Sequence, residues 1–272
     1  MLNIAFQGER GAFSEDAAIK LFGKDIDFLP CIHLRDVFQA VLDDNANFGV
    51  VPVENSQAGS INETYDLLLV YSLNIFAEII LKISHCLMAL PGQSLADIKT
   101  IYSHPQALAQ CEEFLSKLRT DIVPTYDTAG SAKMIKKRQL KQHAAIASRR
   151  AADIYNLEVL APNIETNANN YTKFFTISKQ KAKPAHKNKT SLVFAVRNMP
   201  GTLYSILGIF ASRNINLTKL ESRPSKSKPW EYVFYADLEG HIDSEVYQEA
   251  LVELSKKTTL AKILGSYPQA EQ

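Results

Sequence analysis

Apolar and polar positions in the first 180 residues alternate between two periods. Short apolar runs such as "NIAF" (3–6) and "FGVVPV" (48–53) have the length and β-branched content of buried strands. Between them lie helical segments such as "SEDAAIKLFG". There we expect a helix with a cap at Ser14, an inward face of Ala18, Leu21 and Phe22, and a stop at Gly23. Repeated strand-helix units predict a parallel sheet covered by helices.

The same pattern recurs further along the chain. The strand "TIY" precedes "SHPQALAQCEEFLSKL", for which a stripe of Leu108, Cys111, Leu115 and Leu118 predicts one helix. "DTAGSAKMIKKR" and "SRRAADIY" read as further helices, the second after the strand "AAIA". Residues 75–90 carry β-branched and aromatic residues at alternate positions, so we expect two extended segments that lead from one lobe to another. "FFTIS" (174–178) would lead back.

A change in composition separates a second unit. Residues 178–190 hold five lysines, a proline and no acidic residue, which is typical of an exposed linker. We therefore expect domains at 1–180 and 190–272, joined by a linker at 181–189. The second pattern is a strand (190–196), a helix, two strands ("NLTKLESRP" and "WEYVFYADL"), a helix and a strand. Its first helix should bury Leu203, Ile206, Leu207 and Phe210. The order βαββαβ predicts a ferredoxin-like sandwich.

Composition and charge exclude several classes of function. The 272 residues are 46% hydrophobic, and 30 basic against 29 acidic residues leave a net charge of +1, so we expect neither nucleic acid nor membrane as a partner. Cys31, Cys86 and Cys111 form neither a disulfide framework nor a metal-ligand pattern. The start "MLNIAFQGER" lacks an export signal, which favours a cytoplasmic protein.

Polar clusters follow the predicted strands of the first unit. They occupy Gln7–Ser14, Glu54–Ser60, Ser103–Gln106, Asp127–Ser131 and Thr172. Ligands of open α/β sheets bind at the carboxyl ends of strands, so these clusters predict a cleft. Hydroxyls and amides at helix starts favour anions there, although each alone is more often an ordinary helix cap. The candidates are Asn55, Ser56, Ser60, Ser103, Thr128 and Ser131. His104 reads as a hydrogen-bonded strut, an acid or a ligand, with the strut favoured.

Several motifs in order resemble one known family. "VPVENSQAGS", "YSHPQALAQC" and "NNYTKFF", followed by "NMPGTLYSIL" and "ESRP", resemble prephenate dehydratase with a C-terminal ACT regulatory domain. The resemblance implies an α/β fold: a two-lobed catalytic domain like a type II periplasmic binding protein, then a ferredoxin-like ACT domain. It also implies conversion of prephenate to phenylpyruvate, water and carbon dioxide in phenylalanine biosynthesis, without metal or other cofactor, and feedback inhibition by L-phenylalanine.

The resemblance carries over to particular residues. It implies that Thr172 and Glu54 are catalytic, with Thr172 giving a hydrogen bond to the leaving hydroxyl. The implied substrate-binding residues are Asn55, Ser56, Gly59, Ser60, Ser103, His104, Gln106, Thr128 and Phe174. The sequence departs from the family at Lys173, where arginine is usual. In an extended strand Lys173 points away from the face of Thr172 and Phe174, so it is expected to pair within the protein.

In the second unit the resemblance implies an L-phenylalanine site shared with a partner chain, and hence a homodimer or homotetramer with paired ACT domains. The implied residues are Asn198, Met199, Gly201, Thr202, Leu203, Glu221, Ser222 and Arg223. Two other functions stay open: arogenate dehydratase, which no sequence feature separates, and a noncatalytic ligand-binding module. A fused chorismate mutase is not expected, because the first strand begins within three residues of Met1.

Overall fold

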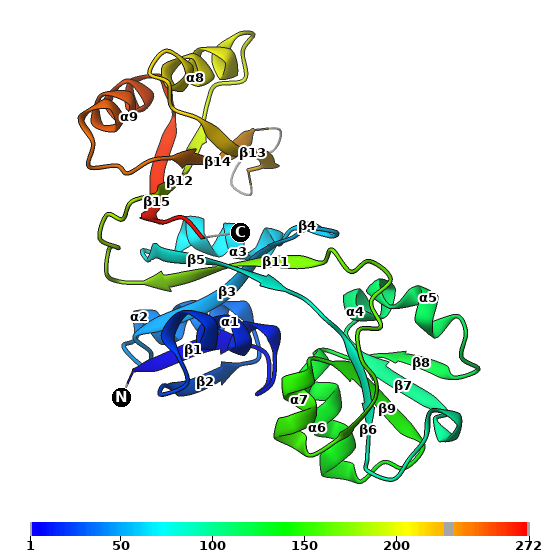
Figure 1. Ribbon diagram of the computed structural model, residues 1–272. Coiled ribbons are helices and arrows are strands. Elements are labelled where there is room, and N and C mark those ends of the chain that lie inside the picture. Colours follow the sequence, from blue (N-terminus) through cyan, green and yellow to red (C-terminus); the bar gives the residue numbers. More distant parts are fainter. Residues whose placement is uncertain (1, 226–230, 271–272) are drawn as a thin grey trace. The chain divides into compact units, whose positions relative to one another are not determined.

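The computed structural model describes residues 2–225 and 231–270 (Figure 1). The predicted strand "WEYVFYADL" begins at Trp230, which lies outside the described residues, and the observed strand begins at Tyr232. Within these ranges the order of elements is an α/β succession followed by βαββαβ.

The first lobe contains a mixed sheet with the strand order β2-β1-β3-β11-β5, and a short β4 pairs with β3. Strand β1 lies parallel to both β2 and β3, as repeated strand-helix units predict. The elements are β1 (Asn3–Gln7), α1 (Phe13–Phe22), β2 (Asp27–Cys31), α2 (Leu34–Leu42), β3 (Phe48–Asn55), β4 (Gly59–Ser60), α3 (Asn62–Val70), β5 (Asn74–Lys82) and β11 (Tyr171–Ser178).

Helix α1 differs from the prediction at its start. Ala12 occupies the N-cap position, and the expected cap Ser14 lies buried inside the first turn. The Glu15 carboxylate instead accepts a hydrogen bond from the backbone N–H of Gly11, at 2.5 Å. At the other end Gly23 ends the helix with φ of 81°, as expected, whereas Leu21 in the last turn is exposed rather than buried.

The second lobe contains a sheet with the order β10-β6-β9-β7-β8. Strands β7, β8 and β9 are parallel, whereas β6 is antiparallel to both of its neighbours, β9 and β10. The elements are β6 (Cys86–Ala89), a 3-10 helix (Leu95–Asp97), β7 (Thr100–Ser103), α4 (Pro105–Gln110), α5 (Glu112–Leu115), β8 (Asp121–Pro124), α6 (Thr128–Arg138), β9 (His143–Ala147), α7 (Arg149–Tyr155) and β10 (Glu158–Ala161).

The single helix predicted after β7 is divided at Cys111 into α4 and α5. The carbonyl of Gln110 accepts a hydrogen bond from the backbone N–H of Thr166 at 2.8 Å, so it does not continue the helical ladder. The predicted stripe still packs inward, because Cys111 and Leu115 are buried and Leu108 and Leu118 pack against the same core. Strands β5 and β6 lead into the second lobe and β11 leads back, as predicted (Figure 1).

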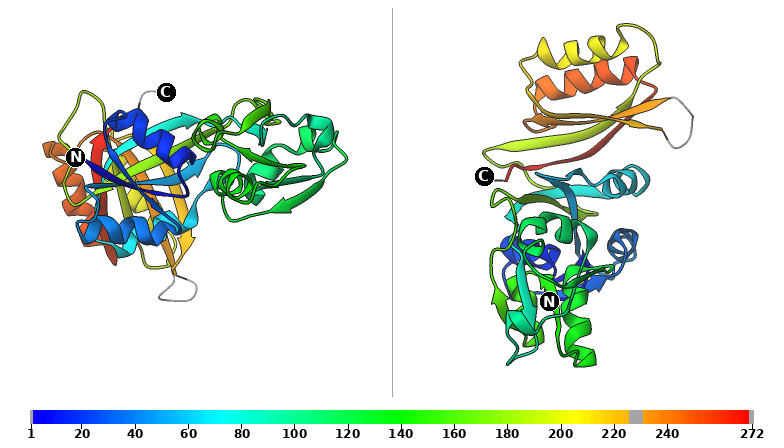
Figure 2. Two further views of the ribbon diagram at one scale, coloured as in Figure 1. Left: turned by 90° about the horizontal axis from the view of Figure 1, so that it is seen from below. Right: turned by 90° about the vertical axis from the view of Figure 1, so that its right-hand side faces the viewer.

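The C-terminal domain is a four-stranded antiparallel sheet with the order β13-β14-β12-β15. Its two helices lie together on one face of the sheet (Figures 1 and 2). This is the predicted ferredoxin-like fold, although Ile209 rather than Leu207 joins Ile206 and Phe210 in the buried core. The elements are β12 (Asn188–Ala195), α8 (Thr202–Ala211), β13 (Leu217–Pro224), β14 (Tyr232–Glu239), α9 (Glu245–Lys257) and β15 (Leu260–Pro268).

The chain packs as two compact units, each built from segments that are separated in the sequence. One unit comprises Met1–Thr64 and Ile79–Phe174, and the other comprises Tyr65–Glu78 and Phe175–Gln272. Within the second unit, the Lys189 ammonium lies 2.7 Å from the Glu78 carboxylate in a buried ion pair. Lys262 donates to the carbonyls of Leu68, Leu69 and Tyr71 at the end of α3. These contacts make α3 and the start of β5 part of the C-terminal unit.

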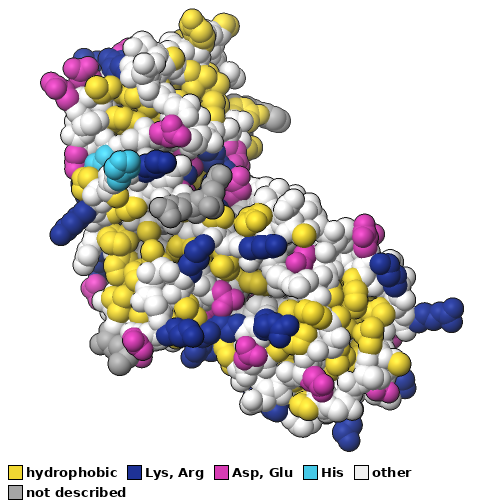
Figure 3. All heavy atoms as spheres, viewed as in Figure 1, with side chains coloured by type: hydrophobic (Ala, Val, Ile, Leu, Met, Phe, Trp, Pro, Cys, Tyr) yellow, Lys and Arg dark blue, Asp and Glu magenta, His cyan; other side chains and the backbone are white. Residues whose placement is uncertain are grey.

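Acidic and basic side chains are interspersed on the face drawn in Figure 3, in keeping with the small net charge. Over residues 2–225 and 231–270, every helix is too short or too polar to cross a membrane. The same described residues contain no group of three or more His, Cys, Asp or Glu placed to hold a metal ion.

Candidate active site

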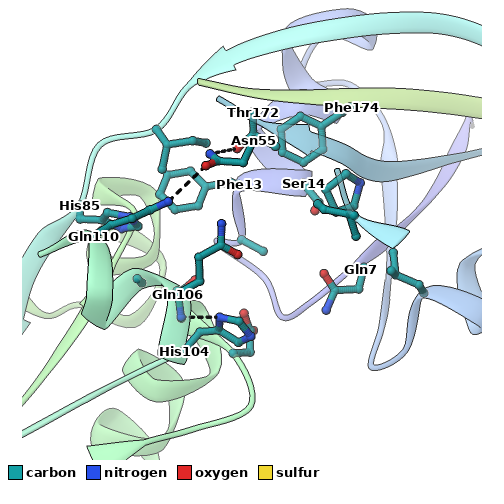
Figure 4. Close-up of a pocket in the computed structure, with 18 of the residues that line it drawn as sticks. Gln7, Phe13, Ser14, Asn55, His85, His104, Gln106, Gln110, Thr172 and Phe174 are labelled. Atoms are coloured by element: carbon teal, nitrogen blue, oxygen red, sulfur yellow. Dashed lines mark hydrogen bonds between the residues drawn. The ribbon is translucent and has the colours of Figure 1, made fainter. Parts of the chain in front are cut away.

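A pocket of about 270 Å³ lies within the first compact unit, between its two lobes (Figure 4). Its apolar lining includes Phe13, Pro52 and Phe174. Its polar side chains come from the strand ends and helix starts of both lobes, where the sequence predicts a cleft. They are Gln7, Ser14, Asn55, His85, His104, Gln106, Gln110, Tyr126, Asp127, Thr128 and Thr172.

Thr172, the first residue of β11 with a buried side chain, lines this pocket and is 8% exposed. Its hydroxyl oxygen accepts a hydrogen bond from the side-chain amide of Asn55, with 3.0 Å between Nδ2 and Oγ1 (Figure 4). A hydroxyl has one proton to donate and two lone pairs to accept with. The amide nitrogen of Asn55 can only donate hydrogen bonds. Thr172 must therefore donate its own hydroxyl proton to a different group.

The orientation of the Asn55 amide is determined by its other contacts. Its oxygen accepts hydrogen bonds from the backbone N–H groups of Gln57 and Ala58, at 3.1 and 3.0 Å. Its nitrogen also donates to the Asn170 side-chain oxygen at 2.7 Å. Two backbone donors identify the oxygen, so the nitrogen necessarily lies toward Thr172. The turn that supplies these donors connects β3 to β4, and Gly59 adopts a φ of 78° in it.

The amide contacts continue into the second lobe. Gln110, at the end of α4, donates to the Asn55 oxygen at 3.3 Å. Its own oxygen accepts from Asn170 at 3.0 Å and lies 2.9 Å from Nε2 of His85. His85 therefore carries its proton on Nε2, and its Nδ1 is buried without a hydrogen-bond partner among the described residues. Asn55, Gln110, His85 and Asn170 are named the amide network below.

Lys173 lies on the opposite face of β11, as alternation along the strand predicts. Its ammonium is 3.4 Å from the Glu54 carboxylate, and neither residue is among those that line the pocket. Thr172 and Phe174 are on the pocket side. The departure from the family's arginine at position 173 therefore lies in an ion pair outside the pocket.

Two helices of the second lobe begin at the pocket. His104 caps α4, and its Nδ1 accepts the backbone N–H of Gln106 at 3.2 Å. Asp127 caps α6, and its Oδ2 accepts the backbone N–H groups of Gly130 and Glu9, each at 3.0 Å. His104 thus holds the helix start as a strut, which is the role favoured from the sequence, while its ring still lines the pocket.

The ionisation of these groups is set mainly by burial. Burial lowers the pKa values of His85 and His104 from the ordinary 6.5, so both rings are neutral at pH 7. Burial raises the pKa of Asp127, against the lowering effect of its backbone hydrogen bonds. Among the described residues that line the pocket there is no lysine or arginine. Asp127 is accordingly the one acidic side chain among the described residues that line the pocket.

Several of the expected site residues lie elsewhere. The structure does not bring Glu54, Ser56, Gly59, Ser60 or Ser103 into the pocket lining. The Ser103 hydroxyl is buried and donates to the carbonyl of Ile146, and the Ser56 hydroxyl accepts the backbone N–H of Tyr171. Ser131, also considered as an anion ligand, donates to the carbonyl of Asp127. These hydroxyls satisfy backbone groups, which is the ordinary use of serine at strand and helix ends.

Other lining residues were not named individually as candidates from the sequence, although Gln7, Phe13 and Asp127 fall in the polar clusters predicted at the cleft. The full set is Gln7, Phe13, His85, Gln110, Tyr126 and Asp127. Gln110 directly follows "SHPQALA", and its helical spacing of four from Gln106 was an available signal. His85 lies between the two crossing strands, and no local pattern connects it with Gln110.

The expected effector residues lie at two places in the C-terminal domain. Asn198 and Met199 are exposed, Gly201 has a φ of 82° at the start of α8, and Leu203 packs on the helix core. The Thr202 hydroxyl donates to the carbonyls of Arg197 and Met199. On β13, Glu221 is 3.0 Å from Lys219 and Arg223 is 3.2 Å from Asp66 of α3, while Ser222 is exposed.

Together the fold and the pocket define a two-lobed unit of the periplasmic-binding-protein type joined to an ACT domain. The chain belongs to the prephenate dehydratase family: the family model "Prephenate dehydratase" matches residues 4–182, and the model "ACT domain" matches residues 190–255. Named relatives include dehydratases of prephenate and of arogenate.

Three similar proteins illustrate the range. A bifunctional chorismate mutase/prephenate dehydratase of Aquifex aeolicus is 42% identical over 99% of this chain and 74% of its own length. Arogenate dehydratase/prephenate dehydratase 2 of Arabidopsis thaliana is 41% identical over 98% of this chain and 73% of its own. A prephenate dehydratase of Arthrobacter aurescens, solved in complex with L-Phe, is 32% identical with a TM-score of 0.90, covering 98% of this chain and 90% of that one.

Proposed function

We propose that the protein removes water and carbon dioxide from the cyclohexadienol ring that prephenate and arogenate share. Prephenate would yield phenylpyruvate, and arogenate would yield phenylalanine. The family, whose relatives include enzymes for both substrates, supports the reaction class. The motifs do not separate the two substrates, so prephenate, the substrate expected from the sequence, and arogenate are both candidates.

The hydrogen bond that the Asn55 amide donates to the Thr172 hydroxyl is the observation that carries this proposal. Asn55 donates to Thr172 Oγ1, and this leaves the Thr172 proton for an acceptor in the pocket. A ring hydroxyl that is leaving develops negative charge on its oxygen. A positioned donor next to it lowers the barrier, typically by a factor of 10²–10⁴.

The chemistry balances with a single proton. The bond between the ring and its carboxyl group breaks, its electron pair enters the ring, and the bond between the ring and the hydroxyl oxygen breaks. The leaving oxygen gains one proton from solvent, delivered through the hydrogen bond from Thr172, and departs as water. Aromatisation provides the driving force, so the chain has to supply orientation and the hydrogen-bond donor.

The family resemblance implies that Glu54 is catalytic. Because Glu54 pairs with Lys173 and lies outside the pocket lining, we propose instead that this pair holds β11 against β3, and with it the Thr172–Asn55 contact. Gln106, Thr128, His104 and Phe174 remain proposed substrate-binding residues, since all of them line the pocket.

We further propose that L-phenylalanine inhibits the enzyme by binding the ACT domains, paired in a homodimer or homotetramer. The L-Phe complex of the Arthrobacter relative supports this. Met199 and Gly201 would contact the effector on one side, and Glu221 and Ser222 of a partner chain on the other. Arg223 is on β13 and Asp66 is on α3, so their ion pair connects β13 with α3. Helix α3 follows β4 in the chain.

The test is a steady-state assay of the purified full chain on prephenate and on arogenate, with and without millimolar L-phenylalanine. Formation of phenylpyruvate or phenylalanine, with sigmoidal or affinity-type inhibition, is expected. If neither product forms, the protein is a ligand-binding module and the proposed reaction is wrong. If turnover is insensitive to L-phenylalanine, the regulatory part alone is wrong.

A further inference from the structure

We propose that Asp127 determines substrate choice by binding the ammonium group of arogenate, so that this chain prefers arogenate to prephenate. The inference rests on the proposed function and concerns the same pocket. The two substrates share a ring, a ring carboxylate and a hydroxyl, and they differ at one carbon of the side chain. Prephenate has a keto group there, whereas arogenate has an ammonium group.

The charge of the pocket distinguishes the two molecules. Prephenate enters with two carboxylates and no cation, whereas arogenate brings the same two carboxylates and one ammonium group. The described lining contains one carboxylate, that of Asp127, and neither lysine nor arginine. Burial keeps His85 and His104 neutral at pH 7. The Asp127 carboxylate thus repels the carboxylates of a substrate that brings no cation, and it attracts a substrate cation placed beside it.

The Asp127 carboxylate is held in place and retains capacity for an ammonium donor. Backbone N–H groups of Glu9, Gly130 and Thr128 bind it, and the side chain is 9% exposed. A carboxylate offers about four lone-pair positions, so three backbone donors leave one for a ligand. Burial raises the pKa of Asp127, and an adjacent ammonium group favours its ionised form again.

The neighbouring charges do not neutralise this carboxylate. The Glu9 side chain lies 2.7 Å from the Lys133 ammonium and accepts from the Tyr126 hydroxyl at 3.1 Å. Lys133 is thereby engaged by Glu9 rather than by Asp127. His104 interacts electrostatically with Asp127 but has a lowered pKa. Since the described lining holds no lysine or arginine, a substrate ammonium group could pair with Asp127 at this end of the pocket.

The position of Asp127 fits the shape of the substrate. Figure 4 places Thr172 and Asn55 at one end of the pocket and His104 at the other. Asp127 belongs to the His104 end, because the two residues follow the adjacent parallel strands β7 and β8, whose ends are joined by a hydrogen bond of 2.8 Å from the backbone N–H of Thr125 to the carbonyl of Ser103. In both substrates the hydroxyl and the side chain are on opposite corners of the ring. A molecule whose hydroxyl contacts Thr172 therefore directs the opposite ring carbon, which carries the ring carboxylate and the side chain, toward the His104 end. The charge of Asp127 repels the carboxylate and favours the side-chain ammonium group there.

The experiment compares kcat/KM for arogenate and prephenate in the full-length wild type and in Asp127→Asn and Asp127→Ser. Both replacements are good N-caps, so they remove the charge while keeping the start of α6. We expect the wild type to prefer arogenate at least tenfold. In both variants the ratio should fall at least tenfold, through a loss with arogenate and a gain with prephenate. Asp121→Asn, an exposed charge removal on β8, should leave the ratio unchanged.

Each result has a distinct meaning. A wild type that prefers prephenate, or a ratio that both variants leave unchanged, overturns the role of Asp127 while the proposed reaction stands. If neither prephenate nor arogenate is turned over, the proposed function itself is contradicted. Because asparagine and serine differ in size, agreement between the two variants attributes the effect to charge, and thermal unfolding confirms that each is folded.

Discussion

The two ends of the pocket use different physics. At the Thr172 end, neutral amides are fixed by one another and by backbone donors, and the outcome is the direction of a single hydroxyl proton. At the His104 end, a buried carboxylate is fixed by backbone N–H groups and the outcome is a local charge. In the proposed function, the fixed orientation at the Thr172 end serves a reaction common to both substrates, whereas the carboxylate at the His104 end is proposed to discriminate between them.

Substitution of Thr172 tests the first end most directly. In Thr172→Ala we expect kcat to fall by about 10²–10⁴ with both substrates alike, because both lose the same leaving hydroxyl. Steady-state kinetics on prephenate and arogenate measure this. Thr172→Ser retains a hydroxyl at the same position and should lose less than about tenfold. Circular dichroism serves as the control for folding, and a folded Thr172→Ala variant that retains more than a tenth of wild-type kcat would refute the role.

The next largest effect is expected for Asn55→Asp. This change has nearly the same shape but replaces the donor next to Thr172 with an acceptor, so the Thr172 proton would turn toward the new carboxylate. We expect kcat to fall by about 10²-fold, within the range for a lost proton donor. In the double variant with Thr172→Ala, the further loss should be small, since the two residues act as a unit.

The control for the comparison of the Asn55→Asp, Thr172→Ala and double variants is Asn47→Asp. The Asn47 oxygen accepts the backbone N–H of Asn3, so this substitution keeps an acceptor at a site outside the pocket lining. Its kcat should equal that of the wild type. Fully additive losses for Asn55 and Thr172 would mean that Asn55 acts on the substrate independently, and would break the proposed connection between the amide and the hydroxyl.

Much of the site could be predicted from the sequence because its parts are local. The cleft at the strand ends, the pocket face shared by Thr172 and Phe174, and the outward position of Lys173 follow from strand periodicity. The ferredoxin-like order of the C-terminal domain likewise follows from its own pattern. The division of the helix at Cys111 does not, because it depends on a hydrogen bond from Thr166, far away in sequence.

The amide network shows why the rest was missed. Asn55 contacts Asn170 and Thr172 across more than a hundred residues, and His85 meets Gln110 only after the crossing strands bring both to the same place. Serine hydroxyls at strand ends, such as Ser103, were expected to bind ligand because the sequence does not show which neighbour they contact. Serine at a strand end looks the same in sequence whether it faces a ligand or, like Ser103, donates to a neighbouring carbonyl.

His85 should give a smaller effect on activity and a specific effect on stability. His85→Phe removes the donor to Gln110, and the loss of one hydrogen bond of about 1 kcal/mol predicts a fall in kcat of about fivefold. The aromatic ring that packs edge-on against Phe13 is retained. The buried Nδ1 that lacks a partner among the described residues is also removed, which offsets the lost bond in the folded state.

The pH dependence separates this role from mere packing. Because burial lowers the His85 pKa below 6.5, the unfolded chain binds more protons than the folded chain between the folded pKa and 6.5. The free energy of unfolding should thus fall as pH falls through this window. In His85→Phe this decrease should be smaller, while groups such as Asp16, with a pKa raised to about 6, contribute equally to both proteins. Parallel pH profiles would contradict a neutral buried His85.

Lys173→Arg should have the smallest effect. The guanidinium retains the positive charge beside Glu54, in a partly exposed ion pair whose contribution to stability is about 0–1 kcal/mol. Since Lys173 lies on the face of β11 away from the pocket, kcat/KM should change by less than about threefold with either substrate. Kinetics on both substrates and thermal unfolding measure this. A tenfold gain would mean that residue 173 contacts a substrate carboxylate, and the uncharged amide end of the pocket would then have a cation after all.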